Sequence, residues 1–226
     1  MHREITKRRL KDICIPLLFF VGILVIWEIL VLVLNIPEYL LPRPTQIIFE
    51  IINNLNTLIK HTGITLFEAI IGYILANILG FSIAVIFAHY KTIEKGIYPY
   101  AIALKTTPII AMAPLLVLWF GTGLVSKIVA AALMCFFPIL VNTVKGLRTI
   151  DDSALELFKS FSASKMQIFT KLRLPNALPY IFSALKISTG LAVVGAVVGE
   201  FVGANKGIGY IILVSSYHLE TVTMFS

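Results

Sequence analysis

Long apolar runs separated by short polar connections dominate this chain. The five longest runs cover residues 13–36, 62–88, 97–120, 125–144 and 179–201. Each is near the ~20 residues that an α-helix needs to cross about 30 Å of hydrocarbon. The pattern predicts five membrane-spanning helices, and residues 1–226 are expected to form one all-α membrane helical bundle.

A sixth apolar run begins at Gly209, but polar residues from His218 to Thr221 interrupt it before the chain reaches Ser226. This length is too short for another full crossing. We interpret residues 209–226 as an incomplete sixth span. A truncated, inactive remnant of a transporter is therefore one hypothesis that the pattern leaves open.

The connection between the first two spans combines a proline-rich stretch with an amphipathic one. Residues 37–44 hold three prolines, which disfavour a helix. Residues 45–60 then carry apolar side chains at helical spacing, with Thr45 as a candidate cap. This pattern predicts an amphipathic helix at the outer membrane interface.

Small residues recur every four positions in the second and fifth spans. They place one stripe of small side chains on each helix, so that a neighbouring backbone can approach closely. We expect a packing role for these stripes, represented by Gly72, Ala76, Gly80, Gly195 and Gly199.

Prolines and acids inside the spans are candidates for the solute path. Pro108 and Pro114 lie within the third span, where each removes a backbone hydrogen bond and favours a kink. An ionisable group within a span commonly faces protein or water. We take Pro108, Pro114 and Glu200 as path candidates, and solvation at the outer helix ends is the alternative for Glu68 and Glu200.

Composition and charge support a membrane protein. The chain is 58% hydrophobic and 14% charged, which excludes an ordinary water-soluble domain. Its formal net charge of +7 could indicate nucleic acid, but the Lys and Arg residues lie in short loops between apolar runs. We therefore expect contact with membrane lipid and none with nucleic acid.

The distribution of positive charge predicts the orientation. With a cytoplasmic N-terminus, the inner segments hold thirteen Lys and Arg residues and the outer segments hold four. Positive residues in short loops are retained on the cytoplasmic side. The longest inner connection, residues 145–176, is then cytoplasmic and large enough to present a folded surface to a partner.

This cytoplasmic loop reads as two short helices with a break between them. Asp151 or Asp152 can cap the first helix, on which Leu155, Phe158 and Phe161 share a face.

The second loop helix is expected to start near Ala163 or Ser164, with Ser162 or Ser164 as its cap. We expect Pro175 to end it.

The loop resembles that of the permease subunits of bacterial and archaeal ABC importers. Their pattern is Glu-Ala-Ala, three residues, Gly, nine residues and Ile-x-Leu-Pro. The spacing is kept here, and the acid and Leu-Pro match, whereas both alanines, the glycine and the isoleucine are replaced. The corresponding positions are Glu156, Leu157, Phe158, Ser162, Leu172, Leu174 and Pro175.

Two further segments, residues 107–123 and 191–210, are similar to the third and fifth spans of one subgroup of this binding-protein-dependent transport family. That subgroup imports nitrate, taurine, alkanesulfonates and related solutes, including some thiamine precursors. The resemblance extends from Trp27 to Tyr210 and implies six spans. It also implies a solute of one of these kinds and a multi-pass location in a bacterial or archaeal plasma membrane.

The same resemblance implies an assembly. The loop helix is expected to dock into a groove on a separate ABC ATPase subunit, which binds ATP and Mg²⁺ and drives the spans between outward and inward access. A second copy of the permease and an external solute-binding protein complete the implied complex. The residues assigned to ATPase coupling are Glu156, Leu157, Phe158, Phe161, Ser162, Ala163, Leu174 and Pro175.

No catalytic, cofactor or metal site is expected in the chain itself. It lacks a Gly-x-x-x-x-Gly-Lys-Ser/Thr loop, a His-Glu-x-x-His pair and a Gly-x-Gly-x-x-Gly turn. A membrane enzyme is the less favoured hypothesis because the four histidines are scattered near span edges. A secondary transporter driven by an ion gradient would normally show inverted repeats and broken helices meeting at charged groups, and the sequence indicates neither.

Overall fold

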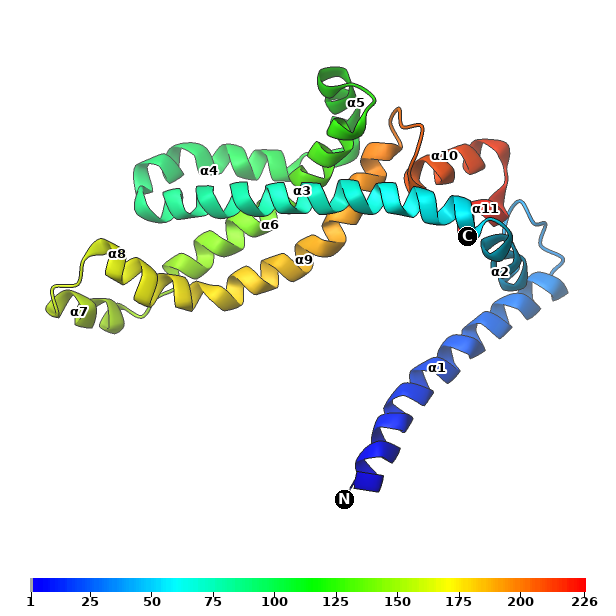
Figure 1. Ribbon diagram of the computed structural model, residues 1–226, viewed down its shortest axis with the longest axis horizontal. Helices are drawn as coiled ribbons and strands as arrows, with labels where there is room; N and C mark the ends of the chain where they lie inside the picture. Colours follow the sequence, from blue (N-terminus) through cyan, green and yellow to red (C-terminus); the bar gives the residue numbers. More distant parts are fainter. Residues whose placement is uncertain (1) are drawn as a thin grey trace. The chain divides into compact units, whose positions relative to one another are not determined.

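A computed structural model describes the backbone of residues 2–226 and the side chains from Cys14 onward, and that part of the chain is helical without strands (Figure 1). The helices, with the π-helical turn η1, are α1 (His2–Val33), α2 (Pro44–Asn53), α3 (Leu55–His89), α4 (Lys91–Thr106), α5 (Ile109–Phe120), α6 (Leu124–Arg148), α7 (Asp152–Ser160), α8 (Lys165–Ile168), η1 (Phe169–Arg173), α9 (Leu174–Glu200), α10 (Ile208–His218) and α11 (Thr221–Phe225). The predicted all-α class is confirmed.

Within the described residues, four helical stretches are long and apolar enough to cross a membrane. They cover Cys14–Val33, Leu55–His89, Leu124–Arg148 and Lys165–Glu200. The bent pair of α4 and α5 brings the number to five if it forms one span.

The third predicted span, residues 97–120, is not one continuous helix. α4 and α5 meet at an angle of 103° across Thr107 and Pro108. Thr107 is extended, with ψ at 122°, because the ring of a following proline disfavours the helical conformation. Pro108 also has no N–H to continue the ladder of α4. The Thr107-Pro108 sequence therefore causes the break between α4 and α5.

The chain divides into two compact units. The first comprises residues 1–59 and 211–226, and the second comprises residues 60–210. In the first unit, Glu28 of α1 accepts hydrogen bonds from the backbone N and Oγ1 of Thr45, at 3.1 and 2.9 Å. Thr45 therefore ties α2 to α1 and is not its cap, since α2 begins one residue earlier with Pro44.

The predicted amphipathic helix over 45–60 is divided in the structure. α2 ends at Asn53, and residues from Leu55 onward already belong to the long helix α3. Asn54 separates the two, and its side chain donates to Glu50 at 2.8 Å. Asparagine has a low helix propensity, which favours a break there.

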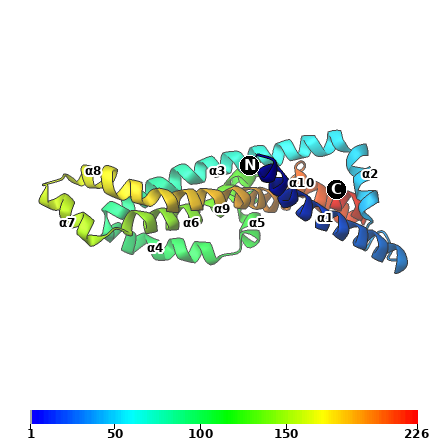
Figure 2. The same cartoon turned by 90° about the horizontal axis from the view of Figure 1, so that it is seen from below.

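The second unit is built around α6 and α9, which lie side by side along their lengths (Figures 1 and 2). Their contact relies on small residues: a Cβ atom added at Gly195 of α9 would lie 2.7 Å from the Cα of Ala131. Gly199 lies against Ala130 and Lys127 in the same seam. Close approach of this kind supplies the dispersion contacts that hold helices together in lipid.

The small-residue stripe of α3 faces α6. A Cβ atom added at Gly72 would lie 2.6 Å from the Cβ of Ala131, and one at Gly80 would lie 3.0 Å from Ile139. Ala76 is buried in the same cluster, together with Ala131. The stripes of α3 and α9 therefore both pack onto α6.

Candidate functional site

The segment between α6 and α9 carries α7, which has no buried residue. Its first turn is closed by Asp151, whose side chain accepts from the backbone N–H of Ser153 at 3.1 Å. Leu157 and Phe161 are 55% and 78% exposed and lie four residues apart, so they form one apolar stripe. We call these two residues the α7 stripe.

The predicted shared face of Leu155, Phe158 and Phe161 is divided by the structure. Leu155 and Phe158 are half-buried, whereas Phe161 projects into the surroundings. Glu156 is exposed beside the stripe. Leu157, rather than Phe158, is therefore the second large apolar side chain that α7 offers to a partner.

A Schellman motif ends α7. The backbone N–H of Ser162 donates to Lys159 O at 2.9 Å, and that of Ala163 donates to Phe158 O at 3.0 Å. The motif needs a left-handed residue at Ser162, whose φ is +53°. Ser162 occupies the position that is glycine in the importer loop pattern, and glycine adopts this conformation without steric cost.

The second loop helix, α8, starts with a capping box. Ser164 Oγ accepts from the backbone N–H of Gln167 at 3.3 Å, and the Gln167 side chain accepts from the N–H of Ser164 at 2.7 Å. Of the two predicted caps, Ser164 is the one used. Met166 on α8 is exposed, and Ala163 before it is half-buried.

The expectation that Pro175 ends this helix is wrong. α8 continues through η1 into α9, which runs from Leu174 to Glu200. The five residues before Leu174 form a π-helical turn in which the Leu174 N–H bonds to Phe169 O. A wider turn leaves room for the Pro175 ring, which would clash with the carbonyl four residues earlier in a regular helix.

The base of the segment is a tight junction between the end of α6 and the start of α9. A Cβ atom added at Gly146 would lie 2.9 Å from Ala177 Cα and from Tyr180 Cβ. Asn176 donates to the carbonyls of Gly146 and Thr149, two of the groups that α6 leaves unpaired at its end. Sequence reasoning missed Asn176, because its partners lie about thirty residues away.

The opposite end of the second unit holds buried polar groups. Glu200 has 0% exposure and accepts from Thr65 Oγ1 at 2.7 Å and from the Gly209 N–H at 2.6 Å. Thr65 Oγ1 in turn accepts from the Ile208 N–H at 2.9 Å. Together they cap the first turn of α10, where a carboxylate is favoured.

The alternative of solvation at the outer helix ends is therefore wrong for both acids. Glu68 is 2% exposed and Lys127, which the charge pattern places in an outer loop, is also 2% exposed. Lys127 Nζ donates to Thr122 O at 2.7 Å. Both line a cavity of about 290 Å³. Glu200 is used in packing this end of the bundle.

The break between α4 and α5 borders a second, mostly apolar cavity of about 190 Å³. Thr107 and Ile109, on either side of Pro108, contribute to its lining, as do Lys105 and Met112. Pro114 lies inside α5 and is not among the residues that line this cavity. Pro108 is not among them either, so the cavity lies beside the break while neither path proline lines it.

The chain matches the family described as "Binding-protein-dependent transport system inner membrane component" over residues 76–221. It is 41% identical, over 86% of its length and 78% of the relative's, to the formylaminopyrimidine transport permease protein ThiX of Halalkalibacterium halodurans. It is 35% identical to a probable ABC transporter permease protein of Haemophilus influenzae, covering 93% of this chain and 86% of that one.

A third relative is the putative aliphatic sulfonates transport permease protein SsuC of Bacillus subtilis, which is 32% identical over 90% of this chain and 75% of its own length. Among solved structures, a chain of the inward-facing MetNI methionine ABC transporter has a similar fold. The TM-score is 0.63 at 22% identity, covering 75% of this chain and 88% of that one.

Proposed function

We propose a coupling role for α7 in this chain, which belongs to the family of binding-protein-dependent transport system inner membrane components. The chain is the membrane-embedded, non-catalytic permease subunit of an ABC importer, and a separate subunit hydrolyses ATP. In the proposal, α7 docks into a groove of that ATPase, which binds ATP and Mg²⁺. ATPase closure then moves the spans through α6 and α9.

The observation that supports this role is the exposed α7 stripe on a helix with defined ends. Leu157 and Phe161 leave large apolar surfaces uncovered on a nine-residue helix. Burying one such side chain in a partner contributes about 1.5–3 kcal/mol. Aromatic anchors of this kind dominate interface energies, and the exposed Glu156 beside them can fix the register.

The remaining coupling residues shape the segment. Ser162 and Ala163 form the turn after α7, and Leu174 and Pro175 begin α9 directly after the π-helical turn. We propose that they hold α7 at a fixed angle to the spans. A rigid connection between α7 and the spans matters, because a flexible connection would not transmit the displacement of the ATPase.

Co-purification with the cognate ATPase tests the docking. Phe161→Asp removes an apolar anchor and places a charge in the proposed groove, so we expect the ATPase to be lost from the purified complex. Glu156→Lys should have the same effect through reversed charge. Phe161→Leu is the matched control, because it keeps an apolar side chain at the same place.

Membrane extraction yield and helix content show whether each variant still folds and inserts. Normal ATPase retention by the Phe161→Asp protein would contradict the docking role of α7.

The proposed assembly has a cytoplasmic N-terminus, two copies of the permease, two ATPases and an external solute-binding protein. The excess of Lys and Arg in the inner segments supports this orientation. The family's dependence on a binding protein supports the external partner. A homodimer is supported by the small number of spans in one copy, since a solute path must be enclosed by helices on all sides.

We propose that the solute is a thiamine-precursor-like pyrimidine, with nitrate and sulfonates such as taurine as the other candidates. The 41% identical relative is named for formylaminopyrimidine transport, which supports this choice. Proteoliposomes with the permease, its ATPase and its binding protein should take up labelled formylaminopyrimidine only with ATP. Uptake that needs an ion gradient instead would favour a secondary transporter.

A further inference from the structure

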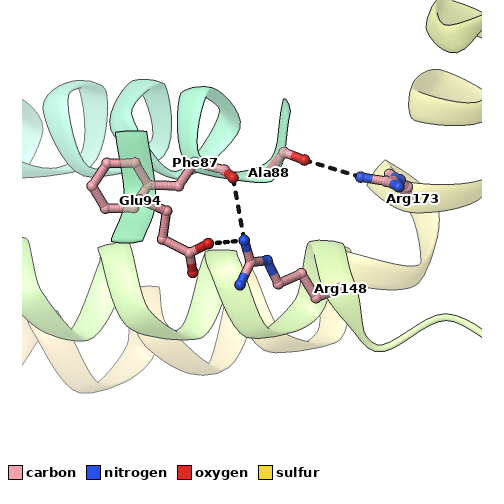
Figure 3. A network of polar contacts seen from close by, with 5 residues as sticks. All are labelled: Phe87, Ala88, Glu94, Arg148 and Arg173. Carbon is pink, nitrogen blue, oxygen red and sulfur yellow. Dashed lines mark hydrogen bonds and ion pairs between the residues drawn. The ribbon is translucent and has the colours of Figure 1, made fainter. Parts of the chain in front are cut away.

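Two arginines fasten both ends of the α7–α8 segment to the end of α3 (Figure 3). Arg148, the last residue of α6, donates to Phe87 O at 3.3 Å and pairs with Glu94 of α4. Arg173, the last residue of η1, donates to Ala88 O at 3.2 Å. One arginine thus precedes the segment and the other ends it. We call Glu94, Arg148 and Arg173 the α3 clamp.

The clamp satisfies groups that α3 itself leaves open. The last carbonyls of a helix have no partner within it and carry partial negative charge. Phe87 and Ala88 lie in the last turn of α3, so a guanidinium is a favourable partner for either carbonyl. Glu94 adds a full negative charge from the first turn of α4, directly after the corner.

Apolar packing behind the clamp keeps it stiff. Ala88, Leu147 and Ala177 form a buried cluster that joins α3, α6 and α9. The ring of His89 lies 5.1 Å from that of Phe169, which joins the end of α3 to η1. Close-packed interiors transmit displacement because they compress little.

The Glu94 carboxylate is largely shielded from water. Its residue is only 9% exposed, and Arg148 is its ion-pair partner. Removing one member of a shielded pair costs more than removing an exposed one, because the remaining charge stays buried. The pair therefore holds the α3–α4 corner against the end of α6.

The structure assigns to Glu94, Arg148 and Arg173 a positioning role in energy coupling, which rests on the proposed docking of α7. Without the clamp, a displacement of α7 reaches the spans only through α6 and α9. With it, the same displacement also moves the end of α3 and the start of α4. Since α4 leads to the break at Thr107 and Pro108, the clamp connects the ATPase to the cavity there.

A labelling experiment on the complete permease–ATPase complex tests this role. Thr92 on α4 is exposed and precedes the predicted span that begins at residue 97, so Thr92→Cys provides a reporter for a fluorescent maleimide. Cys14 is exposed and is replaced by Ser, whereas Cys135 is buried and can stay. The labelling rate is measured without nucleotide and with ATP and vanadate. We expect the rate to change with nucleotide when the clamp is intact.

Charge reversal then separates positioning from folding. Arg148→Glu and Glu94→Arg should each keep the ATPase bound but abolish the nucleotide-dependent change at the reporter. The double reversal should restore part of that change, which a loss of fold would not do. Lys171→Glu is the matched control, because Lys171 is exposed on η1 and its change of charge should leave the response intact.

The outcomes separate this inference from the docking role. Loss of the ATPase from the Phe161→Asp complex with an unchanged reporter response in both single reversals would overturn the clamp alone. No response at the reporter with an intact clamp would overturn it as well. Failure of the docking role is detected independently, by retention of the ATPase in the Phe161→Asp protein.

Discussion

At each end of the α6–α9 pair, charged side chains cap the terminus of a neighbouring helix, but the two ends use groups of opposite charge. At one end, buried Glu200 and Thr65 cap the first N–H groups of α10, which have no partner within that helix. At the other, Arg148 and Arg173 cap the last carbonyls of α3 from partly exposed positions. An anion at a helix start and cations at a helix end both complement the helix dipole. The difference lies in burial.

That difference separates a closed end from an open one. Around Glu200, the carboxylate, Thr65 and the amides of α10 find buried partners within the chain. Around α7, by contrast, the α7 stripe leaves Leu157 and Phe161 uncovered. The end that presents uncovered apolar side chains on a separate short helix is the end at which we place the ATPase. The closed end then holds the helices together while the ATPase displaces the open end.

The largest effect on stability is expected from removing the buried carboxylate at the closed end. Glu200→Ala removes both acceptors that Thr65 and Gly209 use, so we expect a loss of roughly 3 kcal/mol in the free energy of unfolding, typical of breaking a buried polar network. Glu200→Gln keeps one carbonyl acceptor and should lose less. Thermal unfolding in detergent measures both.

The control for this prediction is Glu156→Ala at the open end. Glu156 is exposed, so its loss should change stability by about 0.5 kcal/mol or less. Equal stability of the Glu200→Ala and Glu156→Ala proteins would show that the buried carboxylate does not hold the closed end.

A smaller effect is expected in the seam that joins the two ends. Gly195→Ala places a Cβ atom 2.7 Å from Ala131 Cα, so it should cost roughly 1–3 kcal/mol through overpacking. Gly190, five residues earlier on α9, has nothing within 4 Å of an added Cβ atom. Gly190→Ala should therefore be neutral or stabilise the protein by up to about 1 kcal/mol, through better helix propensity. A similar loss in both variants would refute the close approach.

Hydropathy alone predicted most of the helices, because a span has to be apolar over its full length. The small-residue spacing also pointed to α3 and α9, since Gly72 and Gly195 act through local geometry on one helix face. Ser164 was predictable as a cap because its partner, Gln167, lies three residues away. A feature whose interacting residues are close in sequence can therefore be predicted from the local sequence pattern.

Features that depend on distant partners were not predictable. Glu200 looks like a residue at a solvated helix end until the amides of Ile208 and Gly209 fold back onto Thr65 and Glu200. The clamp joins Arg148 to residues more than fifty positions earlier. The prediction that Pro175 ends a helix failed because a π-helical turn precedes it and tolerates the proline ring. Such a turn has no simple sequence signature.

The smallest predicted effect on stability concerns the turn after α7, at the open end. Ser162 adopts a φ of +53°, which costs an ordinary residue about 1 kcal/mol. Ser162→Gly removes that strain, although glycine loses more chain entropy on folding, so we expect a net gain of about 0.5 kcal/mol in the turn. The Ala163 amide donates to Phe158 O in this turn, so its hydrogen exchange should slow by roughly twofold. Glu156→Gly, in the middle of α7, should speed exchange instead, because glycine destabilises a helix interior. Faster exchange at Ala163 in the Ser162→Gly protein would mean that the serine is not strained and that the end of α7 is held by another contact.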